Sequence, residues 1–248
     1  MGKMSWLKQK NERTLVCIGD SITHGTVSAN YVDKIEHSLR KGMTPFNDYH
    51  WSVVNAGVNG ITSFDVYRNI ESIVYCDPDY VTILIGTNDV KDILNNEGKE
   101  KMKSSSKETP SFNNYELNLI NIVRKILEMT NATVALCTIP PIGEDLSSEA
   151  NYMYVHEANT IIKKVITSNE FVKRKRVYLF DTNYDLRQEI TEFNKRRLFY
   201  PRVEQFMENM RWSYCLHEIL GLSWNLSSCL VLGLSRNAVS FFIHLSRD

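Results

Sequence analysis

The chain has 248 residues, of which 43% are hydrophobic, so we expect a single domain over residues 1–248 with an atypical C-terminal segment from about residue 195. Lysine plus arginine equals aspartate plus glutamate at 29 each, so the net charge provides no attraction to nucleic acid or to an anionic membrane. Residues 1–13 contain several charges and no apolar core of the length that a signal peptide needs, which predicts a cytoplasmic protein. The five cysteines include no C-x-x-C pair, and their odd number argues against a disulfide framework.

The first predicted strand comprises residues 15–18, an apolar run that is partly β-branched. Gly19, Asp20 and Ser21 follow directly, so this strand would place a serine at the rim of a sheet, where open α/β sheets bind their ligands. Taken alone the tripeptide is a weak signal, because turns between strands and helices often use these residues for conformational freedom and capping.

Two further predicted strands end in similar turns. Residues 53–58 lead into a loop that contains Asn59 and Gly60, and residues 81–85 lead into Gly-Thr-Asn-Asp at positions 86–89. Because the carboxyl ends of parallel strands lie side by side, we expect Ser21, Gly60 and Asn88 to converge on one small volume.

The rest of the chain alternates between helices and strands. Helical spacing of apolar residues predicts helices over about 31–39, 63–74, 112–129 and 148–167, and apolar runs predict strands at 133–139 and 177–181. Five strands with intervening helices indicate an α/β fold, a three-layer α/β/α sandwich with a mostly parallel five-stranded sheet.

These motifs resemble the GDSL-type, or SGNH, hydrolase family of serine esterases, whose blocks are named for serine, glycine, asparagine and histidine. Gly19-Asp20-Ser21-Ile22, the stretch 55–60 and Gly86-Thr87-Asn88-Asp89 match the first three blocks in the family's order. The resemblance implies a flavodoxin-like fold and a cofactor-free, metal-free serine esterase. It would hydrolyse a small or lipid-like ester through an acyl-enzyme.

The resemblance also implies roles for single residues. Ser21 would be the nucleophile, and the backbone N–H groups of Ser21 and Gly60 and the side chain of Asn88 would form the oxyanion hole. Asp20 and Asp89 are better interpreted as acceptors that hold the turns beside the site than as catalytic acids.

The fourth block is incomplete. The best match for the catalytic histidine is His244, but Phe241 stands where the family has an aspartate three residues earlier. A backbone carbonyl or Asp248 would then have to orient His244. The alternative hypothesis is a weakened or inactive domain that acts as a binding module or is a decayed relic.

Other classes lack their motifs. G-x-S-x-G is absent around Ser21, there is no Walker A or G-x-G-x-x-G sequence, and His156-Glu and His217-Glu lack the second histidine of a zinc helix. Polar residues interrupt the apolar stretch 219–246, which argues against stable membrane insertion. The expected partner is a small-molecule ester substrate.

Overall fold

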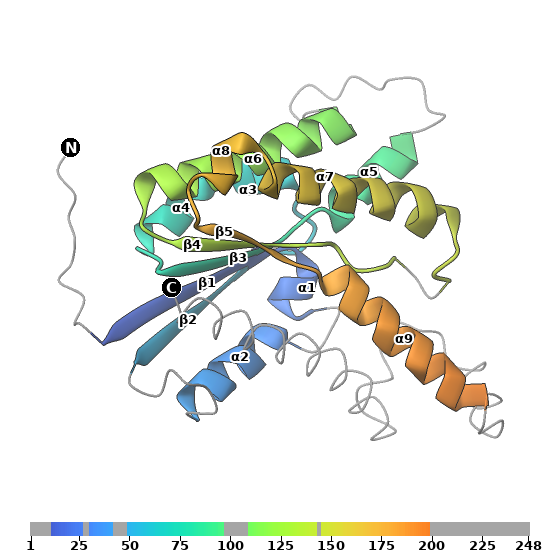
Figure 1. Ribbon diagram of the computed structural model, residues 1–248, viewed down its shortest axis with the longest axis horizontal. Helices are drawn as coiled ribbons and strands as arrows, with labels where there is room; N and C mark the ends of the chain where they lie inside the picture. The colour runs from blue at the N-terminus through green and yellow to red at the C-terminus, as the bar shows by residue number, and fades with distance from the viewer. Residues whose placement is uncertain (1–10, 27–29, 42–48, 97–108, 143–144, 199–248) are drawn as a thin grey trace.

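The computed structural model describes residues 11–26, 30–41, 49–96, 109–142 and 145–198 (Figure 1). Phe241, His244 and the stretch 219–246 lie outside these ranges. Within them, no helix is sufficiently long and apolar to cross a membrane.

The described strands form one parallel sheet with the order β2-β1-β3-β4-β5. This confirms the predicted five-stranded α/β fold, and the order is the flavodoxin-like one. The strands are β1 (Glu12–Gly19), β2 (His50–Gly57), β3 (Tyr80–Leu84), β4 (Thr133–Cys137) and β5 (Val177–Phe180).

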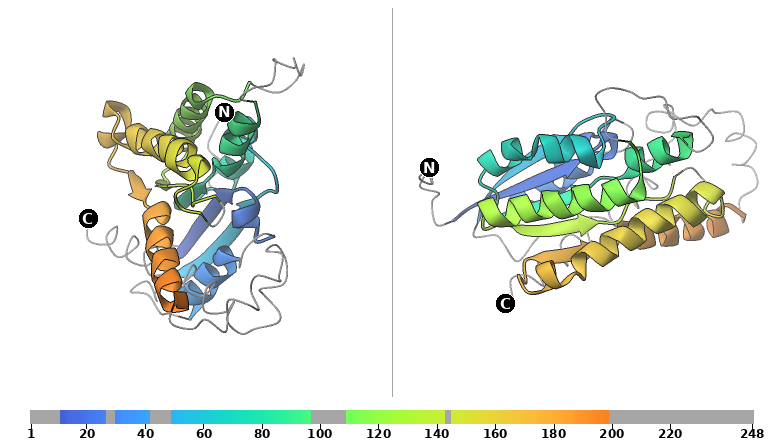
Figure 2. Two further views of the ribbon diagram at one scale, coloured as in Figure 1. Left: turned by 90° about the vertical axis from the view of Figure 1, so that its right-hand side faces the viewer. Right: turned by 90° about the horizontal axis from the view of Figure 1, so that it is seen from above.

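Helices lie on both sides of the sheet, as the two views of Figure 2 show. One side has α3 (Ser63–Arg68), α4 (Ile70–Tyr75), α5 (Thr87–Asn96), α6 (Phe112–Met129), α7 (His156–Ile166) and α8 (Asn169–Val172). The other side has α2 (Tyr31–Arg40) and α9 (Thr182–Leu198), and α1 (Ser21–His24) follows β1 at the edge of the sheet. A π-helical turn, η1 (Ala150–Val155), precedes α7.

Alternation along β1 explains the two layers of core. Val16 and Ile18 pack in the cluster that includes α4 and α6, whereas Leu15 and Cys17 pack against α2 on the opposite face. All four side chains are at most 1% exposed. Because a central parallel strand is covered on both faces, its sequence is continuously apolar.

Two helical expectations are corrected. The helix predicted over 63–74 is broken at Asn69, whose side chain donates to the Asp65 carbonyl at 2.9 Å and so competes with the helical ladder. In α6, Leu117, Ile120, Val123 and Leu127 recur at helical spacing and were expected on the buried face; Val123 and Leu127 are buried, but Leu117 is 52% exposed. The buried face also includes Tyr115, Leu119, Ile122 and Ile126, and position 117 lies on the opposite side of the helix.

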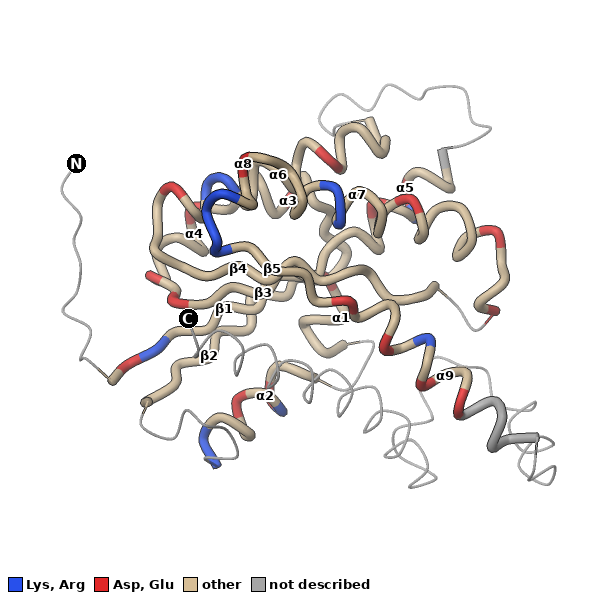
Figure 3. Tube along the Cα trace, in the orientation of Figure 1, with Lys and Arg blue, Asp and Glu red and all other residues tan. Residues whose placement is uncertain are grey.

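Charges of both signs are distributed over the described chain (Figure 3), which agrees with the equal numbers of acidic and basic residues. Among the described residues, no three His, Cys, Asp or Glu side chains are grouped so as to hold a metal ion.

Candidate active site

Ser21 is the first residue of α1, directly after β1. The Asp20 carboxylate caps this turn by accepting from the Ile22 N–H at 2.9 Å. Gly19 is required before it, because a Cβ there would lie 2.0 Å from Thr23 Oγ1 and 2.6 Å from the Leu84 carbonyl oxygen. The close approach of β1 to its own helix and to β3 thus fixes where the serine leaves the sheet.

The loop after β2 is joined to the β1–α1 turn. The Val58 N–H donates to the Gly19 carbonyl at 3.0 Å, and the Asn55 side chain donates to the Thr23 carbonyl at 2.9 Å. Gly60 lies further along this loop with φ +76°, a left-handed conformation that favours glycine, and the space where its Cβ would stand is open.

Asn88 lies in the first turn of α5, directly after β3. Its side-chain amide donates to the Ile61 carbonyl at 2.8 Å, which places it beside the residue that follows Gly60. The next residue, Asp89, accepts from both the N–H and the hydroxyl of Ser63, at 3.0 and 2.5 Å. The loop after β2 and the start of α5 are therefore held together by three side-chain hydrogen bonds.

The structure brings the turns of Ser21, Gly60 and Asn88 to one edge of the sheet, after three adjacent strands. Among the described residues, no group accepts a hydrogen bond from the N–H of Ser21 or Gly60, and the Ser21 hydroxyl has no partner. The Asn88 amide has a second N–H besides the one that binds Ile61. The turns at this edge therefore hold three neutral N–H donors without a described partner, and the Ser21 hydroxyl is half-buried.

Two carboxyl groups lie beneath this site. Burial raises the pKa of Asp89 to about 6, although the hydrogen bonds from Ser63 oppose the rise. Burial also raises the pKa of Asp20, against the Ile22 N–H, Lys91 and the Thr87 hydroxyl. Asp20 accepts within its own turn and Asp89 accepts from Ser63, so neither is directed to a substrate by the contacts it makes.

His24 is the last residue of α1, and its side chain is exposed. Its Nδ1 lies 2.7 Å from Thr26 Oγ1, and the Thr26 hydroxyl donates to Asn59 at 3.1 Å. The predicted base, His244, and the replaced acid position, Phe241, lie outside the described residues.

Sequence reasoning did not identify three supporting residues. Ser63 binds Asp89, Asn118 donates to the Ser63 hydroxyl at 3.3 Å, and the Tyr115 hydroxyl donates to the Ile85 carbonyl at 2.9 Å beneath Gly86. The one available signal was a polar group on the apolar face of a helix, as at Asn118 on α6.

Comparisons with known proteins agree with this architecture. The GDSL-like lipase/acylhydrolase family model matches residues 17–192. A Mycoplasma pneumoniae protein described as uncharacterized is 27% identical over 173 residues, which is 67% of this chain, while the chain spans 18% of that relative.

Two solved structures show the same fold. An acetyl xylan esterase is similar with a TM-score of 0.54 and 24% identity, covering 74% of this chain and 82% of its own. The acetylxylan esterase of Geobacillus stearothermophilus has a TM-score of 0.60 and 19% identity, and the match covers 92% of this chain and 96% of the esterase. On the family match over residues 17–192, the chain belongs to the GDSL-like lipase/acylhydrolase family.

Proposed function

We propose that the protein is a serine esterase in which Ser21 forms an acyl-enzyme. The observation that supports it most is that three uncommitted donors, the N–H groups of Ser21 and Gly60 and the Asn88 amide, lie in turns at one edge of the sheet. Preorganised neutral donors of this kind stabilise the oxyanion of a tetrahedral intermediate. Family membership supports the same reaction class.

In the proposed reaction, Ser21 Oγ attacks the ester carbonyl and its proton passes to a histidine base. The carbonyl oxygen becomes an oxyanion that accepts from Ser21, Gly60 and Asn88. The bond to the alcohol then breaks, and the histidine returns the proton to the alcohol oxygen. Water repeats the sequence on the acyl-enzyme, which releases the carboxylic acid and restores the serine hydroxyl.

The proposed base is His244, where the Ile-His-Leu core fits the family's fourth block but Phe241 stands at the position of the aspartate. Structures of the Geobacillus esterase include catalytic mutants in which a histidine or an aspartate is replaced by alanine. Loss of the orienting acid costs about 10⁴ in rate in the serine-protease example, so an esterase with Phe241 is expected to be slow unless another acceptor orients the histidine.

The substrate class to test first is acetyl esters, because the similar solved structures are of esterases that act on acetylated xylan. Longer acyl esters, which a lipid-like substrate would have, are the comparison.

Phe241 favours a second candidate, a binding module without turnover. The two candidates differ in whether Ser21 is acylated. Ligand binding without ester turnover would support the module, whereas Ser21-dependent turnover would exclude it.

The test measures hydrolysis of p-nitrophenyl acetate and butyrate, with the mass of the intact protein recorded during turnover. Ser21→Ala should abolish both turnover and the acyl adduct, and His244→Ala should slow both. Two matched controls are Ser72→Ala, an exposed serine on α4, and His24→Gln, the exposed histidine on α1. If Ser21→Ala keeps full activity, the proposal is wrong; if His24→Gln alone removes it, the base is misassigned.

A further inference from the structure

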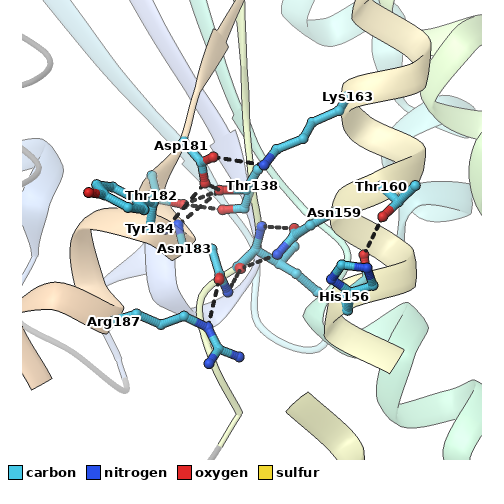
Figure 4. A network of polar contacts seen from close by, with 11 residues as sticks. Thr138, His156, Asn159, Thr160, Lys163, Asp181, Thr182, Asn183, Tyr184 and Arg187 are labelled. Carbon is cyan, nitrogen blue, oxygen red and sulfur yellow. Dashed lines mark hydrogen bonds and ion pairs between the residues drawn. The ribbon is translucent and has the colours of Figure 1, made fainter. Parts of the chain in front are cut away.

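A second group of polar side chains lines a hollow of about 230 Å³ after β4 and β5. Its walls come from η1, α7, the segment that includes Leu146 and the start of α9. Figure 4 shows Arg187 and His156 on opposite sides of Asn183 and Asn159, Arg187 on α9 and His156 on α7. The function proposed above uses none of these residues.

Two buried asparagines make the walls rigid. The Asn151 side chain both accepts from the N–H and donates to the carbonyl of Ile142, and it donates to the Asp145 carbonyl, each at 2.8 Å. Asn159 pairs in the same manner with the N–H and carbonyl of Ile139, at 2.8 and 3.1 Å. The hollow is therefore formed in advance of any ligand.

The charges that line the hollow are unequally paired. Lys163 Nζ lies 2.9 Å from Asp181 Oδ2, and the other Asp181 oxygen accepts from the Thr138 hydroxyl at 2.9 Å. Burial raises the pKa of Asp181, but the bonds from Lys163, Thr138 and the Tyr184 N–H together hold that pKa below its ordinary value. Asp181 thus stays ionised and neutralises Lys163.

Arg187 has no such counter-charge within the described residues. Its Nε donates to Asn183 Oδ1 at 2.9 Å and its Nη1 to the Leu146 carbonyl at 3.3 Å, and these two bonds orient the guanidinium plane. The Nη2 donors and one N–H of Nη1 remain uncommitted. An oriented guanidinium with free donors matches the two oxygens of a carboxylate or phosphate.

The hollow and Ser21 lie at the same edge of the sheet, because all five strands are parallel. In the strand order, β5 is three positions from β1, and neighbouring strands are about 4.8 Å apart, so the two strand ends are separated by about 15 Å. An extended substrate could span that distance along the rim.

We propose that this hollow binds a carboxylate or phosphate group on the alcohol part of an extended ester substrate, with Arg187 as the main contact and His156 as a secondary one. The proposal rests on the esterase function for the position of the ester at Ser21, and it names the substrate class as anionic. The exposed Tyr152, 77% accessible beside the hollow, offers a ring against which the connecting part of the substrate can lie.

The kinetic test uses acetate esters of straight-chain alcohols of graded length that end in a carboxylate, a phosphate or a neutral amide. At the matching length, kcat/KM should be at least about tenfold higher for an anionic ester than for the amide. Carboxylate and phosphate arms show which oxyanion is preferred. Arg187→Gln should lower the anionic-to-amide ratio about tenfold, and Arg187→Lys should lower it less, since a charge remains without the planar fork.

Two further variants keep the test decisive. His156→Ala alters an exposed side chain and should lower the same ratio a few-fold, so it applies even if Arg187→Gln does not fold. Lys173→Gln, an exposed lysine after α8, is the matched control and should leave the ratio unchanged. An anionic-to-amide ratio near one at every chain length would overturn the proposal while leaving the esterase function intact.

Direct binding separates the two proposals. Calorimetry of the Ser21→Ala protein with inorganic phosphate and with a long-chain alkyl phosphate should show binding that Arg187→Gln weakens about tenfold. If no ester is hydrolysed but this binding occurs, the anion site stands and the esterase function fails. If esters are hydrolysed and neither phosphate probe binds, the site proposal fails alone.

Discussion

Asp89 and Ser63 are 26 positions apart in the chain, yet the Asp89 carboxylate accepts both the hydroxyl of Ser63, at 2.5 Å, and its N–H, at 3.0 Å. Ser63 opens α3, after the loop that contains Gly60, and Asp89 follows Asn88 in α5. The pair thus sets the distance between the two turns that supply two of the proposed oxyanion donors.

Removal of the Asp89 carboxyl group should destabilise the protein. Asp89→Ala leaves two donors of the buried Ser63 without a partner, and unsatisfied buried groups cost about 1–3 kcal/mol each, so we expect a loss of about 2–6 kcal/mol. Urea unfolding below the Asp89 pKa of about 6 measures it. Asp92→Asn on the same helix is the control, and a loss no larger than that of the control would contradict the assigned role.

The raised pKa of Asp89 predicts a dependence of stability on pH. Between 3.8 and about 6 the folded state binds a proton that the unfolded state has released, so the free energy of unfolding should fall as the pH rises through this window. A shift of this size corresponds to about 2–3 kcal/mol. Because Asp89→Asn cannot ionise, its stability relative to wild type should increase by that amount across the window.

Asp20 also has a raised pKa, so the dependence of wild-type stability on pH contains contributions from both Asp20 and Asp89. The difference between wild type and Asp89→Asn at each pH isolates Asp89. A difference that stays constant from pH 3.8 to about 6 would show that Asp89 titrates as an ordinary carboxyl group.

The parallel sheet was predictable because β1 and β3 are mostly apolar runs. Such runs are typical of strands in a parallel sheet that is covered on both faces. The amphipathic helix α6 was predicted with its correct ends, Phe112 and Met129. The break at Asn69 was not predictable, because it depends on a side-chain bond to one carbonyl within an otherwise suitable apolar pattern. Helix α9 was missed because its sequence is mostly polar and provides little periodicity.

That the turns of Ser21, Gly60 and Asn88 lie at one edge of the sheet followed from strand topology and from motifs with a known order. The bonds that support them did not, since the Asp89–Ser63 pair and the Tyr115–Ile85 bond join residues far apart in the chain. No periodic pattern encodes such a contact. The hollow at Arg187 was likewise not predictable from the sequence, because its walls come from four separate segments.

Gly57, the last residue of β2, and Gly60, in the loop that follows, should respond differently to alanine. A Cβ at Gly57 would lie 2.2 Å from the His24 backbone nitrogen, so Gly57→Ala must displace α1 and should cost about 3 kcal/mol. At Gly60 the space is open and only the positive φ is unfavourable, which costs about 1 kcal/mol. Thermal unfolding of both variants tests this order, and equal losses would contradict the close packing at Gly57.

Asn88→Ala should act on catalysis more than on substrate binding. The side chain donates one N–H to Ile61 and leaves the second for the oxyanion, which develops only as the serine attacks. Loss of one such donor costs about 10²–10³ in kcat, with KM changed much less. Asn95→Ala, an exposed asparagine on the same helix, is the matched control.

The result separates an oxyanion donor from a purely structural residue. If Asn88 served only to hold the loop at Ile61, its loss would lower the unfolding free energy and shift KM and kcat together, because the loop would be displaced in the free enzyme as well as in the transition state. If the loop keeps its position and only the oxyanion donor is lost, kcat falls while KM stays nearly the same. Measurement of kcat, KM and the urea midpoint on one preparation of Asn88→Ala therefore decides between the two roles.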